Sequence, residues 1–374
     1  MNRIRSTQRT SKSFRSSAVL SALFGLFTAS ASGEPIDPDK FASLGVLSGA
    51  AGAYALNTGD GASTPTLTEP GGVTLDGVIF AQPTGGNVAV FDFDTLTINA
   101  GMAFTITGSI PLVLLSRGDA TIDGGLDVSG GDGGNQTSGG VNPGGAGVAG
   151  GGRGGDTLDV AGVGGGPGVG GVGSIGGGGG GFGGMGGAGL GGGAPGATYG
   201  DLTRALQAGS GGGGGLDSGG GRATGGGAGG GAIEIGAIGM LNIGGSGIHA
   251  DGGIGAGGGA GSGGGIILFG NQVNLTSVLS ADGGDFSFGG IPSFTPGGGG
   301  GGGRILIETG PGGFNSQGAV TVNRGRAAEG QLGQDGTIVI MQNGIAVPEP
   351  SSVILMAVGL AAAVGWNRRS RRAA

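Results

Sequence analysis

Long glycine tracts recur at the same place in a repeated phrase, and no other feature limits the possible folds of this chain as much. Glycine accounts for 108 of the 374 residues. There is no strict Gly-X-Y repeat with abundant proline, which excludes a collagen triple helix. The longest tract spans 131–230, where 51 of the 100 residues are glycine. Such a segment has almost no side chains whose burial could offset the entropy lost when its backbone is ordered.

The phrases between the tracts predict short β-strands. Copies begin at Leu112, Ala232 and Ile266, and a degraded copy begins at Arg304. Each has an apolar run, a turn, a second alternating run and a small-residue ending, which is the pattern of paired strands. Strands this short cannot bury a face alone, so the copies should stack on one another. We therefore expect an all-β fold, a parallel β-helix or β-solenoid with long glycine-rich insertions; a β-sandwich with large insertions is the alternative.

The same pattern predicts the domain organisation and the core. The expected parts are a signal peptide at 1–31, a linker or N-terminal cap at 32–72, first rungs at 73–130, a glycine-rich insertion at 131–230, further rungs with glycine-rich loops at 231–344 and a tail at 345–374. The residues expected to point inward are Leu112, Leu114, Ile122, Leu126, Val128, Ile233, Ile235, Leu241, Ile243, Ile248, Ile267, Phe269, Val273, Leu275, Ile305 and Ile307.

The sequence is compatible with two conformational states of the glycine tracts. Entropy favours mobile loops. Stretches such as GGFGGMGGAGLGGG have a loose three-residue rhythm, which suits polyproline-II-like segments that pack side by side because they lack β-carbons. Apart from one or two helical turns expected at 201–208, no helical period is present.

Composition excludes several classes of function. The chain has no cysteine, so it has neither disulfides nor thiolate metal sites. All 24 acidic residues lie between the two basic ends, which argues against nucleic-acid binding. The single histidine, His249, has no partner motif. Asp119, Asp123 and Asp127 recur every four residues and could form a calcium or catalytic carboxylate cluster on one continuous strand. We expect them instead to lie on a solvent face, with no cofactor, no metal and no enzyme activity.

The N-terminus has the pattern of a secretory signal peptide. Five basic residues precede the apolar run AVLSALFGLFTASA, and Ala29 and Ala31 form an A-x-A site that predicts cleavage after Ala31. The secretion translocon is the expected partner. A helix that stays in the membrane is the alternative.

The C-terminus combines three elements in a fixed order. Pro348, Glu349 and Pro350 are followed by an apolar run at 353–366, which as a helix is shorter than the membrane core, and then by the cluster Arg368, Arg369, Arg371 and Arg372. The arginines favour a cytoplasmic end. This trio resembles the PEP-CTERM sorting signal of Gram-negative bacteria. The resemblance implies a transmembrane segment, processing by a membrane protease of the exosortase type, and delivery to the cell surface or extracellular matrix. A simple C-terminal anchor is the alternative.

The body resembles a loosely defined group of glycine-rich bacterial surface proteins in phrases such as PLVLLSRGDATIDG and GGGRILIE. We therefore expect an exported, non-enzymatic surface or matrix protein, with an exopolysaccharide as a candidate partner. The alternatives are a polysaccharide-active β-helix enzyme, a lyase or hydrolase that uses Asp119, Asp123 or Asp127, and an adhesin that binds ice or glycan.

Overall fold

The computed structural model describes residues 35–134, 142–156, 168–171, 176–216, 223–287, 296–327, 331–343 and 345–346. The chain divides into two compact units, residues 1–32 and 33–374, and every described residue belongs to the second. The signal peptide with Ala29 and Ala31, the Pro-Glu-Pro sequence, the segment 353–366 and the arginine cluster lie outside the described residues. Within those ranges, no helix has the length and apolar character that a membrane crossing requires.

The described part of the chain is almost entirely β-structure and extended segments, which confirms the all-β prediction. One short 3-10 helix, η1 (Pro38–Lys40), precedes the strands. The strands are β1 (Val46–Leu47), β2 (Gly52–Asn57), β3 (Thr66–Thr68), β4 (Thr74–Asp76), β5 (Val78–Ala81), β6 (Asn87–Phe93), β7 (Thr95–Ile98), β8 (Met102–Thr107), β9 (Leu112–Ser116), β10 (Ala120–Ile122), β11 (Leu126–Asp127), β12 (Gly215–Leu216), β13 (Ala223–Thr224), β14 (Ala232–Ala237), β15 (Met240–Ile243), β16 (Ile248–His249), β17 (Gly265–Leu275), β18 (Val278–Ser280), β19 (Arg304–Ser316), β20 (Ala319–Thr321), β21 (Thr337–Gln342) and β22 (Ile345–Ala346).

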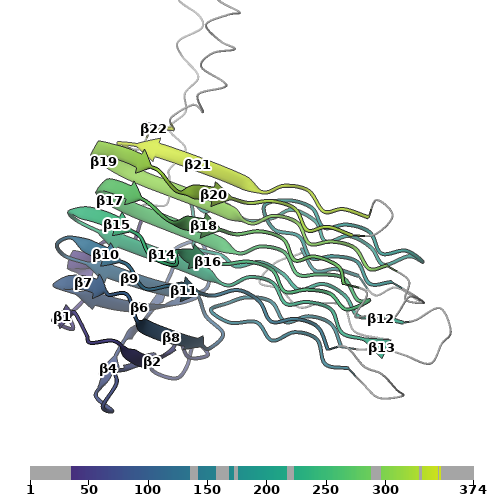
Figure 1. Ribbon diagram of the computed structural model, residues 1–374, viewed down its shortest axis with the longest axis horizontal. Helices are drawn as coiled ribbons and strands as arrows, with labels where there is room; N and C mark the ends of the chain where they lie inside the picture. The colour runs from purple at the N-terminus through teal and green to yellow at the C-terminus, as the bar shows by residue number, and fades with distance from the viewer. Residues whose placement is uncertain are drawn as a thin grey trace, which may run out of the picture. The chain divides into compact units, whose positions relative to one another are not determined.

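The repeated copies stack in parallel and in register, as the sequence predicted. In the first ladder, β6, β9, β14, the start of β17, the start of β19 and β21 lie side by side (Figure 1). Ile233 of β14 is the register partner of both Leu112 and Ile266, so equivalent positions of successive copies meet. Ile266 in turn pairs with Ile305. Each copy therefore continues the buried row begun by the copy before it.

Two further ladders complete each copy. The second contains β1, β7, β10, β15 and the later parts of β17 and β19; the third contains β11, β16, β18 and β20. A bulge between Gly270 and Gln272 separates the parts of β17 that belong to the first and second ladders. Antiparallel strands lie at both ends of the first ladder, β5 beside β6 and β22 beside β21. Both are short, and short strands at a sheet edge offer few free backbone groups for further edge-to-edge association.

The core lies where the three ladders face one another. Most of the inward residues predicted from sequence are buried there. Ile267 and Phe269 are corrections, since Ile266 and Leu268 point into this core, whereas Ile267 and Phe269 belong to a second cluster on the outer side of the first ladder. Every position of the run IILF is apolar, so its alternation could not indicate which set faces inward.

The second cluster explains why both sides of the first ladder are apolar. Phe182, Leu202 and Leu206 from the long insertion cover this outer side together with Ile36. The segment expected to hold helical turns forms one turn, in which the amide of Ala205 donates to the carbonyl of Asp201. A sheet covered on both faces needs continuous hydrophobic runs rather than strict alternation.

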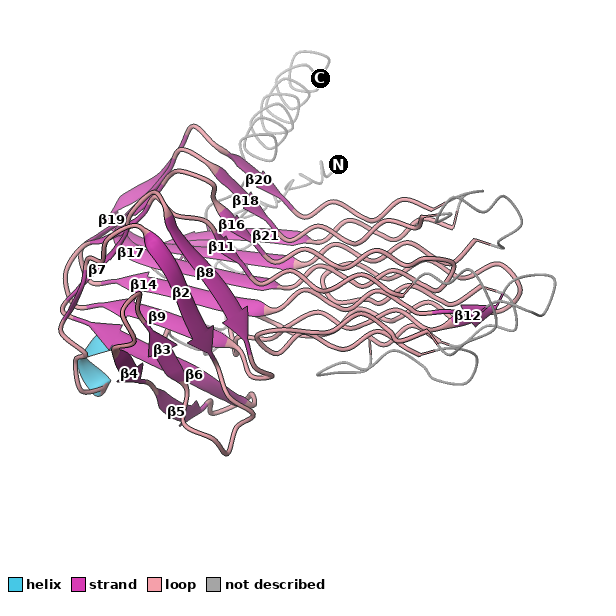
Figure 2. Cartoon of the chain, turned by 60° about the horizontal axis from the view of Figure 1, so that its bottom comes forward, coloured by secondary structure: helices cyan, strands magenta, loops and turns pink. Residues whose placement is uncertain are grey.

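The glycine tracts are ordered in their described parts. Extended segments leave the third ladder, turn and return to the first ladder (Figure 2). We call the described parts of 129–231, together with 250–264, 281–286, 296–303, 322–327 and 331–336, the glycine bundle. Along one segment, every third amide donates to the same neighbouring segment. The amides of Gly226 and Gly229 donate to the carbonyls of Gly155 and Gly152 in one neighbour. The next amides, those of Gly227 and Gly230, donate to the carbonyls of Gly259 and Ser262 in another. Of the two states that the sequence allowed, mobile loops and packed polyproline-II-like segments, the described parts have the packed one.

Glycine is required where a segment is surrounded by others. The inner segment 297–303 is all glycine, and a β-carbon on Gly298 or Gly301 would overlap the backbone of a neighbouring segment. The outer segment 331–336 has the sequence QLGQDG. Its two glycines, Gly333 and Gly336, face Gly300 and Gly303, while Leu332 and Asp335 are exposed. Glycine content therefore follows the number of neighbours around each segment.

Candidate functional site

Aspartates bridge the segments that leave the third ladder. Asp251 follows β16, and its Oδ1 accepts the amide of Asp282 at 2.7 Å. Asp282 follows β18, and its Oδ1 accepts the amide of Asn323 at 2.6 Å. Asp285 accepts the amide of Arg326 at 2.7 Å in the same way. The amides of Asp251 and Ile254, three residues apart, are bonded in the same way to side chains of the preceding copy, whereas those of Gly252 and Gly253 between them bond to backbone. A side chain thus supplies the acceptor for every third amide along this segment.

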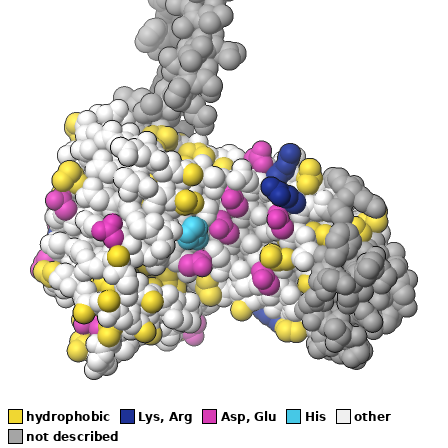
Figure 3. Space-filling view, viewed as in Figure 1, with side chains coloured by type: hydrophobic (Ala, Val, Ile, Leu, Met, Phe, Trp, Pro, Cys, Tyr) yellow, Lys and Arg dark blue, Asp and Glu magenta, His cyan; other side chains and the backbone are white. Residues whose placement is uncertain are grey.

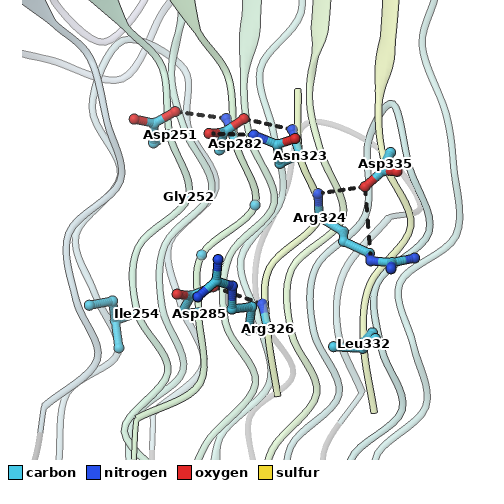
Figure 4. Close-up of a pocket in the computed structure, with 12 residues that line it drawn as sticks. Asp251, Gly252, Ile254, Asp282, Asp285, Asn323, Arg324, Arg326, Leu332 and Asp335 are labelled. Atoms are coloured by element: carbon cyan, nitrogen blue, oxygen red, sulfur yellow. Dashed lines mark hydrogen bonds and ion pairs between the residues drawn. The ribbon is translucent and has the colours of Figure 1, made fainter. Parts of the chain in front are cut away.

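A groove runs along these aspartates. Its volume is about 920 Å³. Figure 4 shows the charged residues along it, with Ile254 and Leu332 beside them. These two aliphatic side chains are 38% and 39% exposed, which gives the groove apolar as well as charged surface. The lining residues used below are Ile254, Asp285, Arg324, Arg326, Leu332 and Asp335.

The carboxylates of the groove differ in how many hydrogen bonds they already accept from the protein. Both carboxylate oxygens of Asp251 and Asp282 accept hydrogen bonds within the protein. Asp285 and Asp335 each accept one backbone amide through Oδ1, from Arg326 and Arg324 respectively. Arg324 lies 4.0 Å from Asp335, and both side chains are at least half exposed. The part of the groove formed by Asp285, Arg324 and Asp335 can therefore form further hydrogen bonds with a ligand.

His249 lies beside the inner end of the groove. It is the only histidine of the chain, coloured cyan in Figure 3, where acidic side chains lie around it. Its Nδ1 is 2.8 Å from Ser280 Oγ, and Ser280 Oγ donates to Asp251 Oδ2 at 2.9 Å. Its Nε2 is 3.0 Å from the carbonyl oxygen of Ser246. Burial raises the pKa of Asp251, and its hydrogen bonds to Asp282 and Ser280 oppose that rise.

The three aspartates singled out in the sequence do not share one strand. Asp119 lies in the turn between β9 and β10, where its Oδ1 accepts the amide of Met240 at 2.7 Å. Asp123 follows β10, and Asp127 ends β11, where it accepts the amide of Ser129 at 2.9 Å. Turns separate the strands that a continuous pattern would have joined. The described residues contain no group of three or more histidine or acidic side chains that could hold a metal ion.

Sequence reasoning missed the groove aspartates, although a signal was present. The repeat ending contains the same ADGG in HADGG and SADGG, which places Asp251 and Asp282 at equivalent positions. A composition-based reading assigns these acids to the solvent. Their contacts with the next copy become evident only when the copies are stacked.

Two other carboxyl groups are buried beneath the N-terminal segment. Glu234 is 2% exposed, and its Oε1 accepts the amide of Ile36 at 2.8 Å. Burial raises the pKa of Glu234 to about 8. Asp92 is also 2% exposed and pairs with Arg117 at 2.9 Å. Burial raises the pKa of Asp92, and Arg117 opposes the rise. These groups hold residues 36–41 against the first ladder, since Arg117 also donates to the carbonyl of Phe41.

The comparison with protein families identifies the C-terminus. Residues 346–371 match the PEP-CTERM protein-sorting motif. The match contains Pro348, Glu349 and Pro350 and three of the four arginines that carried the resemblance in the sequence, Arg368, Arg369 and Arg371. It implies export and sorting toward the cell envelope, with an exosortase, a membrane protein, as the processing partner. No curated protein and no solved structure matches the chain.

Proposed function

Starting from the PEP-CTERM motif that the chain carries at residues 346–371, we propose that it is an exported, non-enzymatic structural protein of the cell surface or extracellular matrix. The motif is the observation that carries the export and sorting steps of this proposal. The secretion translocon exports the chain, the segment 353–366 holds it briefly in the inner membrane, and an exosortase cleaves the tail. The body is then delivered to the outer membrane, the surface or the matrix.

The proposed contribution of the body to this function is its stiffness. The stacked copies form a β-solenoid, and the glycine bundle extends each copy with further ordered segments. Neighbouring bundle segments are joined by hydrogen bonds every third residue, for example from Gly298 and Gly301 to Gly177 and Gly180. Such a network resists bending because displacing one segment strains the bonds to several neighbours. The body therefore acts as a stiff spacer.

Removal of residues 347–374 tests the sorting step. We expect the truncated chain to be secreted into the medium or left in the periplasm rather than retained at the envelope, as measured by cell fractionation and immunoblotting. A matched variant replaces Arg368, Arg369, Arg371 and Arg372 by Gln and keeps the remaining tail. Envelope attachment of the truncated chain at the level of the full chain would contradict sorting by this tail.

The groove favours glycan binding as a second candidate function. A saccharide presents hydroxyl groups and an apolar C–H face, and the groove offers Asp285, Arg326 and Asp335 beside Ile254 and Leu332. An exopolysaccharide is the corresponding partner. Sedimentation of the full chain with insoluble polysaccharide tests this role, with Arg326→Gln expected to weaken binding. Equal sedimentation of Arg326→Gln and the unaltered chain would contradict binding in the groove, whichever result the tail deletion gives.

The non-enzymatic assignment has its own test. Asp119, Asp123 and Asp127 each lie at a different turn or strand end. We therefore expect no release of reducing ends or unsaturated products when the chain is incubated with acidic polysaccharides and calcium. Turnover that is lost on Asp123→Ala would establish the alternative, a polysaccharide-active enzyme.

A further inference from the structure

The contacts of His249 leave one of its two ring nitrogens free to gain or lose a proton. The carbonyl oxygen of Ser246, 3.0 Å from Nε2, can only accept a hydrogen bond. Nε2 therefore carries a proton in both charge states of the ring. Nδ1, 2.8 Å from Ser280 Oγ, is the nitrogen at which the charge changes.

The proton on Nδ1 decides where the hydroxyl hydrogen of Ser280 points. In the neutral ring, Nδ1 can only accept, so it takes the Ser280 hydrogen, and Asp251 Oδ2 loses its donor. In the protonated ring, Nδ1 donates to Ser280 Oγ, and the hydroxyl hydrogen is free to bond to Asp251 Oδ2, 2.9 Å away. Ser280 is 4% exposed, so its one hydroxyl hydrogen has to go to either His249 Nδ1 or Asp251 Oδ2 rather than to solvent.

Charged groups reach the surroundings of the imidazole from its own segment and from the neighbouring elements. Asp251 Oδ2 lies 3.8 Å from Nδ1. Asp127 of β11 is the register partner of His249 on one side, and Ser280 of β18 is its partner on the other. Asp282, which follows β18, donates its amide to Asp251. The charged groups that these neighbouring elements bring to the imidazole are thus carboxylates.

We propose that His249 is a proton-operated latch that ties the segment after β16 to β18 when its ring is protonated and loosens this joint when the ring is neutral. The joint lies where the third ladder passes into the glycine bundle. Its two halves are Asp251, at the start of one bundle segment, and Asp282, at the start of the next. The latch therefore makes the rigidity of this junction depend on pH, independently of how the chain is sorted.

The test follows the imidazole and the joint in the same full-length protein. Because the chain has a single histidine, its ring nitrogen resonances in NMR are unambiguous. Amide exchange of Asp282, corrected for the intrinsic effect of pH, should slow about fivefold as the ring becomes protonated, the factor that corresponds to one ordinary hydrogen bond. The two midpoints should coincide. The amide of Arg326, which donates to Asp285 Oδ1 at 2.7 Å, is the matched reporter and should not follow the ring.

Two variants complete the test. In Ser280→Ala, the ring should still titrate while the exchange of Asp282 no longer follows it. In His249→Gln, the pH dependence at Asp282 should disappear. Exchange of Asp282 that does not change across the ring titration would overturn the latch, as would a dependence that survives in folded Ser280→Ala.

Discussion

The α-carbon of Gly301 faces the carbonyl oxygen of Gly184, leaving no room for a β-carbon between them. The two residues are far apart in sequence and meet because the segment 296–303 is enclosed by other segments of the glycine bundle. This contact is typical of the bundle interior, where backbone rather than side chains fills the space.

We predict that Gly301→Ala lowers the free energy of unfolding by about 1–3 kcal/mol, because the methyl group must push two backbone segments apart. Chemical denaturation measures the change. Gly86→Ala is the matched control, since a β-carbon at Gly86 would meet nothing within 4 Å. The control should stay within about 0.5 kcal/mol of the original chain. Equal stability of both variants would mean that the bundle is not closely packed in solution.

Glu234 should make the fold less stable as pH rises. Its pKa is about 8 in the folded chain against 4.5 for an ordinary glutamate, so between these values the folded chain holds a proton that the unfolded chain has lost. Its contribution is therefore fully present below about pH 4.5 and is lost as pH approaches 8, with a slope of up to about 1.4 kcal/mol per pH unit.

Thermal melts across this range measure the dependence. Glu234→Gln keeps an acceptor for the amide of Ile36 and removes the charge, so its melting temperature should vary less with pH. A steeper pH dependence in the variant would contradict this role.

Arg117 should matter through the charge that it neutralises. Replacing it by Met leaves the carboxylate of Asp92 buried without its ion pair, at an expected cost of about 3–5 kcal/mol. The double variant Asp92→Leu with Arg117→Met removes both charges and should recover much of that loss. Denaturation of the two variants side by side measures the difference. A double variant as unstable as Arg117→Met would show that packing, not charge, dominates here.

Leu268→Ala should test the packing of the core between the ladders. Leu268 is fully buried there, and truncation should cost about 2–5 kcal/mol. Ile238, 47% exposed at the turn before β15, is the control position for Ile→Ala and should change stability little. A small effect of Leu268→Ala would contradict the close packing of this core.

Much of the β-structure could be predicted from sequence because each copy has the same rhythm. The parallel stacking of β9, β14 and β17 followed from the similarity of the copies and from strands too short to bury a face alone. The assignment of Ile267 and Phe269 to the core was wrong because their neighbours are equally apolar. What decides the register is the cover over the outer face, supplied by Phe182 and Leu206, and the local pattern has no information on it.

The candidate site was less accessible to sequence reasoning. Asp251 and Asp282 were visible as repeated acids, but the amides that they accept belong to the next copy. Glycine segments carry no side-chain signal that identifies their neighbours, so the pairing of 226–229 with 152–155 could not be predicted. The pattern suggested the three-residue period but not the partners.

The return of each pair of glycine segments to the first ladder has a consequence for how such a chain can lengthen. Chain leaves the third ladder after β18 and re-enters the first at β19, one step further along the stack. A duplicated stretch from β17 to residue 303 would therefore begin and end at matching places. A gene duplication could therefore insert another copy in the middle of the stack. The antiparallel strands β5 and β22 would remain at the two ends of the first ladder.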